Sequence, residues 1–134
     1  MKLTGECFCG EVKYENNGIL SDARSCHCSR CRKAFSSQAS AYALVNSSEF
    51  KWVSGVELLS SYIGELGYGL QFCSRCGSTL CGIYLNAVHG IALGCLSEDP
   101  EIEIGRHIFV GSKASWEVIP DGVLQYEENS PENA

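Results

Sequence analysis

The spacing of the cysteines constrains this 134-residue chain more than any other feature, because seven of its nine cysteines fall into three tight clusters. Two thiolates on one turn converge readily on a single metal ion. Cysteines one residue apart, in contrast, do not easily bridge each other within unstrained disulfide geometry. The spacing therefore predicts metal binding rather than a disulfide framework or scattered redox cysteines. The clusters are Cys7-Phe8-Cys9, Cys26-His27-Cys28-Ser29-Arg30-Cys31 and Cys73-Ser74-Arg75-Cys76-Gly77.

The count of cysteines and the N-terminal sequence also argue against a disulfide framework. Nine is an odd number, so at least one cysteine would stay unpaired. Residues 1–6 lack the apolar core of a signal peptide, which predicts a cytoplasmic, reducing location. A set of thiolates suits zinc or an iron–sulfur cluster. Paired doublets and a triplet differ from the runs typical of ferredoxins, and we therefore expect zinc.

The remaining composition is that of one ordinary globular domain. Hydrophobic residues make up 45% of the chain and charged residues 19%. No apolar run approaches the ~18 residues that a membrane span needs. The net charge of -6 argues against nucleic acid or an anionic membrane surface as a partner. We expect a single domain over residues 1–126 and a disordered tail over 127–134, where no apolar residue anchors the chain.

Short alternating segments separated by turn residues predict a mainly β fold. A hairpin is expected over residues 2–15, turning at Cys9-Gly10. A brief helix is expected over residues 31–35 and a loop over 64–69, where three glycines occur. Further strands are expected over residues 22–28, 39–46, 50–53, 58–63, 70–73, 79–85, 91–96 and 107–110.

The seven clustered cysteines divide naturally into four and three. A structural zinc has four protein ligands, whereas a catalytic zinc has three and keeps one position open. The doublets Cys7/Cys9 and Cys73/Cys76 can supply a closed site, and the triplet Cys26/Cys28/Cys31 can hold an open one. Strand alternation places Cys26 and Cys28 on one face, and a turn then brings Cys31 back.

A closed triplet with a fourth protein ligand is the alternative, and it would carry no chemistry. His27 is a weak candidate for that ligand, because it lies between two ligands and should point the opposite way. The other candidates are Cys81, Cys95, His89 and His107.

Basic residues gather around the triplet in a chain that is acidic elsewhere. They are Arg24, Arg30, Arg32 and Lys33. They either stay solvated and offset the thiolate charge, or attract an anionic ligand that carries a carboxylate. Because an open zinc with three sulfur ligands favours a soft donor, the second alternative points to a small anionic thiol.

The clusters resemble those of the glutathione-dependent formaldehyde-activating family. Four motifs occur in order from Gly5 to Trp116: Gly5-x-Cys7-x-Cys9-Gly10-x-Val12, Cys26-His27-Cys28-x-x-Cys31, Phe72-Cys73-x-x-Cys76-Gly77-x-x-Leu80, and His107-Ile108-Phe109-Val110 before Trp116. The resemblance implies the Mss4-like fold, with several coiled antiparallel sheets around zinc. It also implies two zinc ions per chain, a structural one on Cys7, Cys9, Cys73 and Cys76, and a catalytic one on Cys26, Cys28 and Cys31.

The family's activity implies a carbon–sulfur lyase, similar to S-(hydroxymethyl)glutathione synthase, that joins glutathione or a similar anionic thiol to formaldehyde or another small aldehyde. The alternative is a non-catalytic, zinc-stabilised binding module, because the Mss4-like fold also serves in partner binding. Cys81 and Cys95 fall outside the family's ligand pattern, and we expect both to pack in apolar strands. His107 and Trp116 match the C-terminal motif, and we expect packing roles for them as well.

Overall fold

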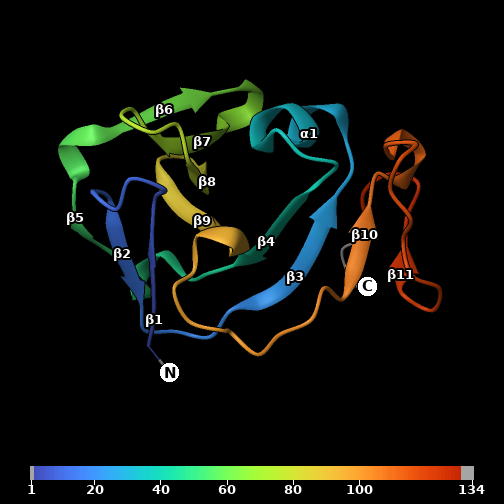
Figure 1. Cartoon of the computed structure of the whole chain (residues 1–134), viewed down its shortest axis with the longest axis horizontal. Coiled ribbons are helices and arrows are strands. Elements are labelled where there is room, and N and C mark those ends of the chain that lie inside the picture. The colour runs from blue at the N-terminus through green and yellow to red at the C-terminus, as the bar shows by residue number, and fades with distance from the viewer. Residues whose placement is uncertain (1, 131–134) are drawn as a thin grey trace. The chain divides into compact units, whose positions relative to one another are not determined.

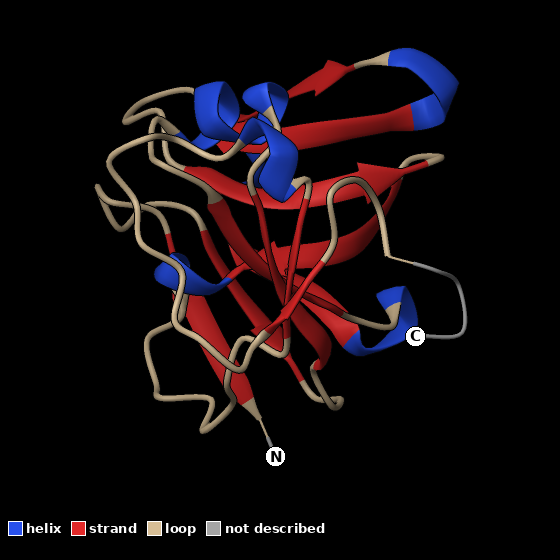
Figure 2. Ribbon diagram, turned by 90° about the vertical axis from the view of Figure 1, so that its right-hand side faces the viewer, coloured by secondary structure: helices blue, strands red, loops and turns tan. Residues whose placement is uncertain are grey.

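The computed structural model describes residues 2–130 and confirms the mainly β fold class (Figures 1 and 2). Its contacts divide the chain into two compact units. Unit 1 comprises the described residues up to Ser21 together with Ala43–Glu101. Unit 2 comprises Asp22–Tyr42 together with the described residues from Ile102 onward. Each unit thus combines segments that are distant in the sequence.

Unit 1 contains two sets of antiparallel strands. In the first, β2 (Lys13–Asn16) pairs with β1 (Leu3–Glu6) on one side and with β5 (Phe50–Ser54) on the other. The second is a run of neighbouring hairpins, and Figure 1 shows its strands in green to yellow. Its members are β6 (Leu59–Ile63), β7 (Tyr68–Cys73), β8 (Thr79–Tyr84) and β9 (Ala87–Ala92).

The expected strand over residues 91–96 is wrong in its bounds, because β9 covers Ala87–Ala92 instead. A two-residue turn at Leu85 and Asn86, both with positive φ, lets the chain reverse directly after β8. Two consecutive left-handed residues match the strand twist of a tight hairpin, but leucine gives no sequence signal for such a turn. Residues Leu93–Cys95 form a 3-10 turn, so Cys95 does not lie in a strand.

Short 3-10 turns connect several other strands. In unit 1 they cover Ser47–Glu49, Val56–Leu58 and Glu65–Gly67, and in unit 2 one covers Val110–Ser112. The turn at Glu65–Gly67 falls in the loop expected from the glycines, and β7 begins at Tyr68 directly after it.

The core of unit 1 lies between its two sets of strands and includes one cysteine of the first cluster and one of the third. Val12, Tyr14, Leu80 and Ile91 are almost completely buried there. Cys7 and Cys73 belong to the same cluster of buried side chains. Because these two cysteines are part of the core, whatever binds them also ties the core together.

Unit 2 has three parallel strands and one short helix. The strand β10 (Arg106–Ile108) pairs in parallel with β3 (Ser21–Cys26) and with β11 (Leu124–Gln125). No residue of the helix α1 (Ser29–Phe35) is fully buried. The buried set of unit 2 includes only a few apolar residues beside Ser25, His27 and His107. Polar contacts and the cysteine triplet therefore carry much of its internal structure.

The strand β4 (Ser40–Leu44) continues from unit 2 into unit 1.

At the C-terminal end of the chain, the expected tail over 127–134 falls partly on residues 131–134, which lie outside the described residues. Before them, the carbonyl of Glu128 accepts a hydrogen bond from the Phe109 N–H. The single domain and the disordered tail stay predictions.

Candidate metal centres

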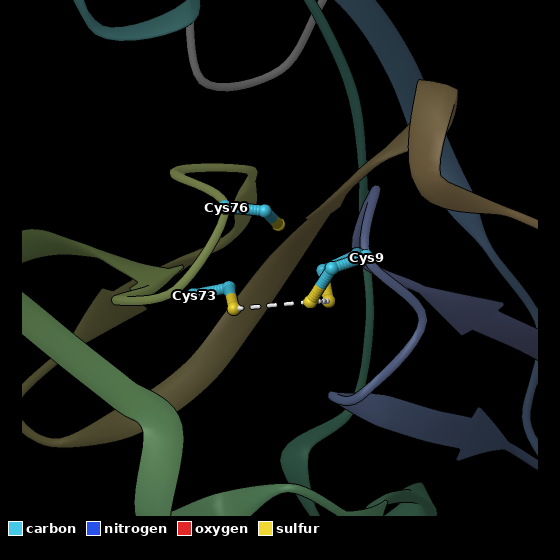
Figure 3. A group of neighbouring side chains, drawn as sticks. Cys9, Cys73 and Cys76 are labelled. Atoms are coloured by element: carbon cyan, nitrogen blue, oxygen red, sulfur yellow. Dashed lines mark hydrogen bonds between the residues drawn. The ribbon is translucent and has the colours of Figure 1, made fainter.

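The structure brings Cys7, Cys9, Cys73 and Cys76 together within unit 1, and their sulfur atoms all lie within 4.8 Å of one another. Figure 3 shows Cys9, Cys73 and Cys76 with their side chains turned toward a common point. The Sγ of Cys9 lies 3.5 Å from that of Cys7 and 3.9 Å from that of Cys73. Tetrahedral zinc with Zn–S bonds of about 2.3 Å requires sulfur atoms about 3.8 Å apart. The donor set therefore fits a four-coordinate zinc.

Two similar turns present these four cysteines. The Gly10 N–H donates to the Cys7 carbonyl at 3.0 Å, and the Gly77 N–H donates to the Cys73 carbonyl at 2.8 Å. Both glycines have positive φ, 81° and 82°, which a residue with a Cβ rarely adopts. The Cys-Gly pairs in the sequence are thus explained by the turns that aim the sulfur atoms.

Ser78 joins the two turns, and sequence reasoning did not single it out. Its hydroxyl accepts a hydrogen bond from the Phe8 N–H at 2.8 Å and lies 3.3 Å from the Sγ of Cys76. Burial acts to raise the pKa of Cys76, but hydrogen bonds from Ser78, together with those from Cys9 and Cys73, outweigh it and lower that pKa to about 5. A thiolate at neutral pH is the form that a metal ion binds.

Cys26, Cys28 and Cys31 form a second group within unit 2, with sulfur atoms also within 4.8 Å of one another. Cys26 is the last residue of β3, and Cys31 lies in the first turn of α1. Cys28 caps the helix, because its sulfur accepts a hydrogen bond from the Cys31 N–H at 3.3 Å. The helix therefore begins at Ser29, two residues before the expected residue 31. Cys28 is at once the N-cap of this helix and a member of the sulfur group.

The hydrogen bond between Cys26 and Cys31 shifts the pKa values of the two thiols in opposite directions. The hydrogen bond from Cys26 lowers the pKa of Cys31 to about 6. The same hydrogen bond, together with burial, raises the pKa of Cys26. Three sulfurs this close suit one cation, which would take the place of the shared protons.

Within residues 2–130, no histidine, cysteine or carboxylate joins the triplet as a fourth donor. Each alternative ligand has contacts of its own. The Cys81 sulfur donates to the Gln71 side chain, and the Cys95 sulfur donates to the Thr79 carbonyl. The ring of His89 packs against those of Tyr68 and Tyr84. Cys81 is almost completely buried, in agreement with a packing role.

His27 points to other polar groups in unit 2. Its Nε2 lies 2.8 Å from the Nδ1 of His107, and its Nδ1 lies 3.3 Å from the carboxylate of Glu117. Both imidazoles are buried, and burial lowers the pKa of each. This row of three side chains connects the loop between Cys26 and Cys28 to β10 and to the segment after it. Sequence reasoning missed Glu117, whose partner His27 lies far away in the chain.

The four basic residues around the triplet have different environments. Arg24 forms an ion pair with Asp22, and its guanidinium lies 5.9 Å from the centre of the Tyr42 ring. Arg30 is exposed on α1. Arg32 and Lys33 line a surface hollow of about 470 Å³ together with Ser36, Ser37, Gln38 and Trp116. Trp116 is 71% exposed, in contrast to the packing role expected for it.

The fold and the two cysteine groups, one of four and one of three, define a small β protein with two candidate metal centres. The family model of the glutathione-dependent formaldehyde-activating enzyme (GFA) matches residues 2–112. The chain therefore belongs to the GFA family.

A solved structure supports the same fold. The chain is similar to a protein of Rhodobacter sphaeroides with a TM-score of 0.56 and 25% sequence identity. The match covers 92% of this chain and 98% of that one.

Among the described residues, no helix is long and apolar enough to cross a membrane.

Proposed function

We propose that the chain binds two zinc ions and acts as a carbon–sulfur lyase or synthase of the GFA type. It would join glutathione, or a similar anionic thiol, to formaldehyde or another small aldehyde. The observation that carries this proposal is the contrast between the two cysteine groups. One has four donors, and the other has three with no fourth among the described residues.

The group of four is the proposed structural site. Cys7 and Cys73 are buried in the core of unit 1, and four sulfur donors leave no position for a substrate. Its role would be to hold the turn after β1 against the turn after β7. Structural zinc sites of this kind contribute on the order of 10 kcal/mol to folding.

The triplet is the proposed catalytic site. Cys26, Cys28 and Cys31 would hold the metal, and a zinc bound there would favour the thiolate form of a substrate thiol at its open position. Cys28 and Cys31 are partly exposed, so a small molecule can approach the group from solvent. His27, through His107 and Glu117, would fix the loop that carries two of the three sulfurs.

The proposed reaction balances without a further reactant. The thiol sulfur forms a bond to the aldehyde carbon, the C=O double bond becomes C–O–H, and the thiol proton ends on that oxygen. The reverse reaction breaks the same S–C bond and regenerates thiol and aldehyde.

Cobalt substitution at the triplet tests the proposal. We expect two zinc ions per chain in the purified protein by elemental analysis. Titrating glutathione into the cobalt-substituted protein should shift the visible spectrum of the metal, and added formaldehyde should give an S-hydroxymethyl product by NMR faster than without protein. No spectral shift at millimolar glutathione would refute the thiol-binding site and leave the zinc-stabilised binding module as the better description.

A further inference from the structure

We propose that Ser40 is a positioning residue of the triplet, whose buried hydroxyl donates a hydrogen bond to the Cys31 sulfur when that sulfur binds a metal ion. This inference rests on the proposed function, because it requires a metal at the triplet. It deepens that proposal by naming a residue outside the cysteine motifs that orients one ligand and sets its strength as a donor.

Ser40 carries a buried polar group that lacks a partner of its own. It is the first residue of β4 and is 1% exposed. Its Oγ is shielded from solvent and makes no complete hydrogen bond within residues 2–130. A buried hydroxyl in this situation is costly, and folded proteins keep few of them. Such a group is therefore a candidate to serve a bound ion or its ligands.

The acceptor within reach of this hydroxyl is the Cys31 sulfur. The hydrogen bond from Cys26 is the main cause that lowers the pKa of Cys31, and the Ser40 side chain lowers it further. A hydroxyl stabilises a thiolate in this way by directing its proton at the sulfur. Because the proton of a serine hydroxyl rotates to suit its acceptor, Ser40 can complete this bond when Cys31 carries a full negative charge.

The path of the chain returns Ser40 to the triplet. Cys26 ends β3, Cys31 lies in the first turn of α1, and β4 follows the helix (Figure 1). Ser36 ends α1 in a left-handed conformation with φ of 52°, and β4 begins four residues later beside β3 in the sheet. Ser40 and the three cysteines all belong to unit 2.

Tyr42 supports the same orientation of β4. Side chains two residues apart on a strand share a face, so Tyr42 and Ser40 point to the same side. Burial raises the pKa of Tyr42, and the charges of Cys26 and Cys31 contribute to that rise. The face of β4 that carries Ser40 is therefore the face turned toward the triplet.

Packing alone explains less of this arrangement. Alanine would fill a position chosen only for small size, and it would leave no polar atom unpaired. Ser78, at the group of four, shows a serine hydroxyl with a second partner, since it accepts from the Phe8 N–H and also lies 3.3 Å from the Cys76 sulfur. In the described part of the chain, Ser40 has no such second partner, which leaves the sulfur group as the one it serves.

A hydrogen bond to a ligating thiolate has two effects. It fixes the orientation of the sulfur, and loss of such a supporting contact typically weakens metal binding by about 10–100-fold. It also draws electron density away from the sulfur, which then gives less charge to the metal. With Cys31 as a weaker donor, the thiolate form of a substrate at the open position is held more strongly.

Cobalt substitution tests this contact through the sulfur-to-metal charge-transfer band, which depends on the electron density of the ligating sulfurs. S40A should shift this band to longer wavelength, because a thiolate without its hydrogen bond gives up an electron more easily. It should also weaken cobalt binding at the triplet by about tenfold. The group of four is the same in every variant, so difference spectra report on the triplet.

S37A is the matched control, since it removes the same hydroxyl from an exposed serine of the same segment, where the group donates to Gln38. It should leave the band and the cobalt affinity unchanged. S40T keeps the hydroxyl and should retain the band of the unmodified protein. S40V has the shape of threonine without the hydroxyl and should show the shift of S40A.

A lower Tm in S40A with an unchanged band would show that Ser40 only packs, and would overturn the inference. If the variants fail to fold, a crystal structure of the unmodified zinc protein decides, because a Ser40 hydroxyl turned away from the Cys31 sulfur would overturn it as well. A hydroxyl directed at that sulfur is the expected result.

Failure of this inference and failure of the proposed function are distinguishable. A cobalt spectrum that responds to glutathione, with no change of the band in S40A, would refute the role of Ser40 alone. A band that shifts in S40A, with no response to glutathione, would support the role of Ser40 and refute the thiol-binding site.

Discussion

At the scale of single residues, the cysteines differ in burial and in their neighbours. Cys7 and Cys73 are buried in the core of unit 1, whereas Cys28 and Cys31 are partly exposed in unit 2. Cys81 is buried outside both sulfur groups. The same chemical group is therefore expected to have different effects on stability and metal content at each position.

The variants Cys73→Ser and Cys28→Ser separate the two proposed sites. Cys73→Ser should lose the metal of the closed site and lower Tm by about 10 °C or more, because it removes a sulfur ligand from the core. Cys28→Ser should lose only the triplet metal and change Tm by a few degrees, since serine is itself a favourable helix N-cap. Metal analysis and thermal unfolding measure both effects.

Cys95→Ser is the control for these variants, because Cys95 lies outside both groups and its sulfur donates a hydrogen bond to the Thr79 carbonyl, which a serine hydroxyl can also do. It should keep two metal ions per chain. Equal changes in Tm for Cys28→Ser and Cys73→Ser would contradict the division into a structural and a catalytic site.

Tyr14 is buried with an unpaired hydroxyl, so Tyr14→Phe should leave stability unchanged or raise it by about 1 kcal/mol at neutral pH. Burial also raises the pKa of Tyr14 above the value near 10 of a free tyrosine. The unfolded chain therefore loses this proton first as the pH rises, and the folded protein loses stability above pH ~10.

The phenylalanine variant lacks this pH dependence. The difference in free energy of unfolding between Tyr14→Phe and the unmodified protein should grow by up to about 1.4 kcal/mol per pH unit above pH ~10. Denaturant unfolding at pH 8 and at pH 11 measures it. A variant that is destabilised by the same amount at both pH values would show that the hydroxyl has a favourable partner.

At the scale of elements, the close pairing of β1 and β2 depends on a glycine. Gly5 lies opposite Tyr14 in the register of the two strands. A Cβ at position 5 would overlap the Tyr14 ring, including its Cε2 at 2.7 Å. The Gly5-x-Cys7 motif is thus explained by the room that a core tyrosine needs beside the first cysteine turn.

Gly5→Ala should therefore destabilise the protein by about 1–3 kcal/mol, the usual cost of overpacking a core. Gly94→Ala is the matched control, because nothing lies within 4 Å of a Cβ at that position and its φ is not in the left-handed region. Urea denaturation compares the two. Similar stabilities would mean that the Tyr14 ring moves aside at little cost.

At the scale of the whole molecule, bound metal should be a large part of the stability. Unit 2 buries few apolar side chains, and the core of unit 1 includes two of the proposed ligands. Removing zinc with an excess of chelator under reducing conditions should release two ions per chain and abolish cooperative thermal unfolding near the original Tm. Circular dichroism follows the loss of β structure.

Chelator saturated with zinc beforehand is the control for this experiment and should leave the unfolding curve unchanged. The metal-free protein should refold when zinc is returned before its thiols oxidise. A metal-free protein with the Tm of the original would contradict the expectation that zinc is structural.

Much of the fold class and of the cysteine clusters could be predicted from the sequence, but contacts between distant segments could not. The cysteine spacing predicted each doublet and the triplet, because each of these clusters is local, whereas the joining of the two doublets into one group of four was expected from the number of ligands that a closed zinc site needs and from the family resemblance. The hairpin at Leu85 and Asn86 was missed, since the only local signal for two left-handed residues in a row was a single asparagine. The position of β9 was wrong for the same reason.

The sequence by itself determined the mainly β class, the three cysteine clusters and the family, because short-range spacing and alternation carry that information. Only the tertiary structure decided what surrounds those groups. The row of His27, His107 and Glu117, the link through Ser78, and the hollow between Arg32 and Trp116 all join residues far apart in the chain. Their partners are set by how strands pair and loops return, which no local pattern specifies.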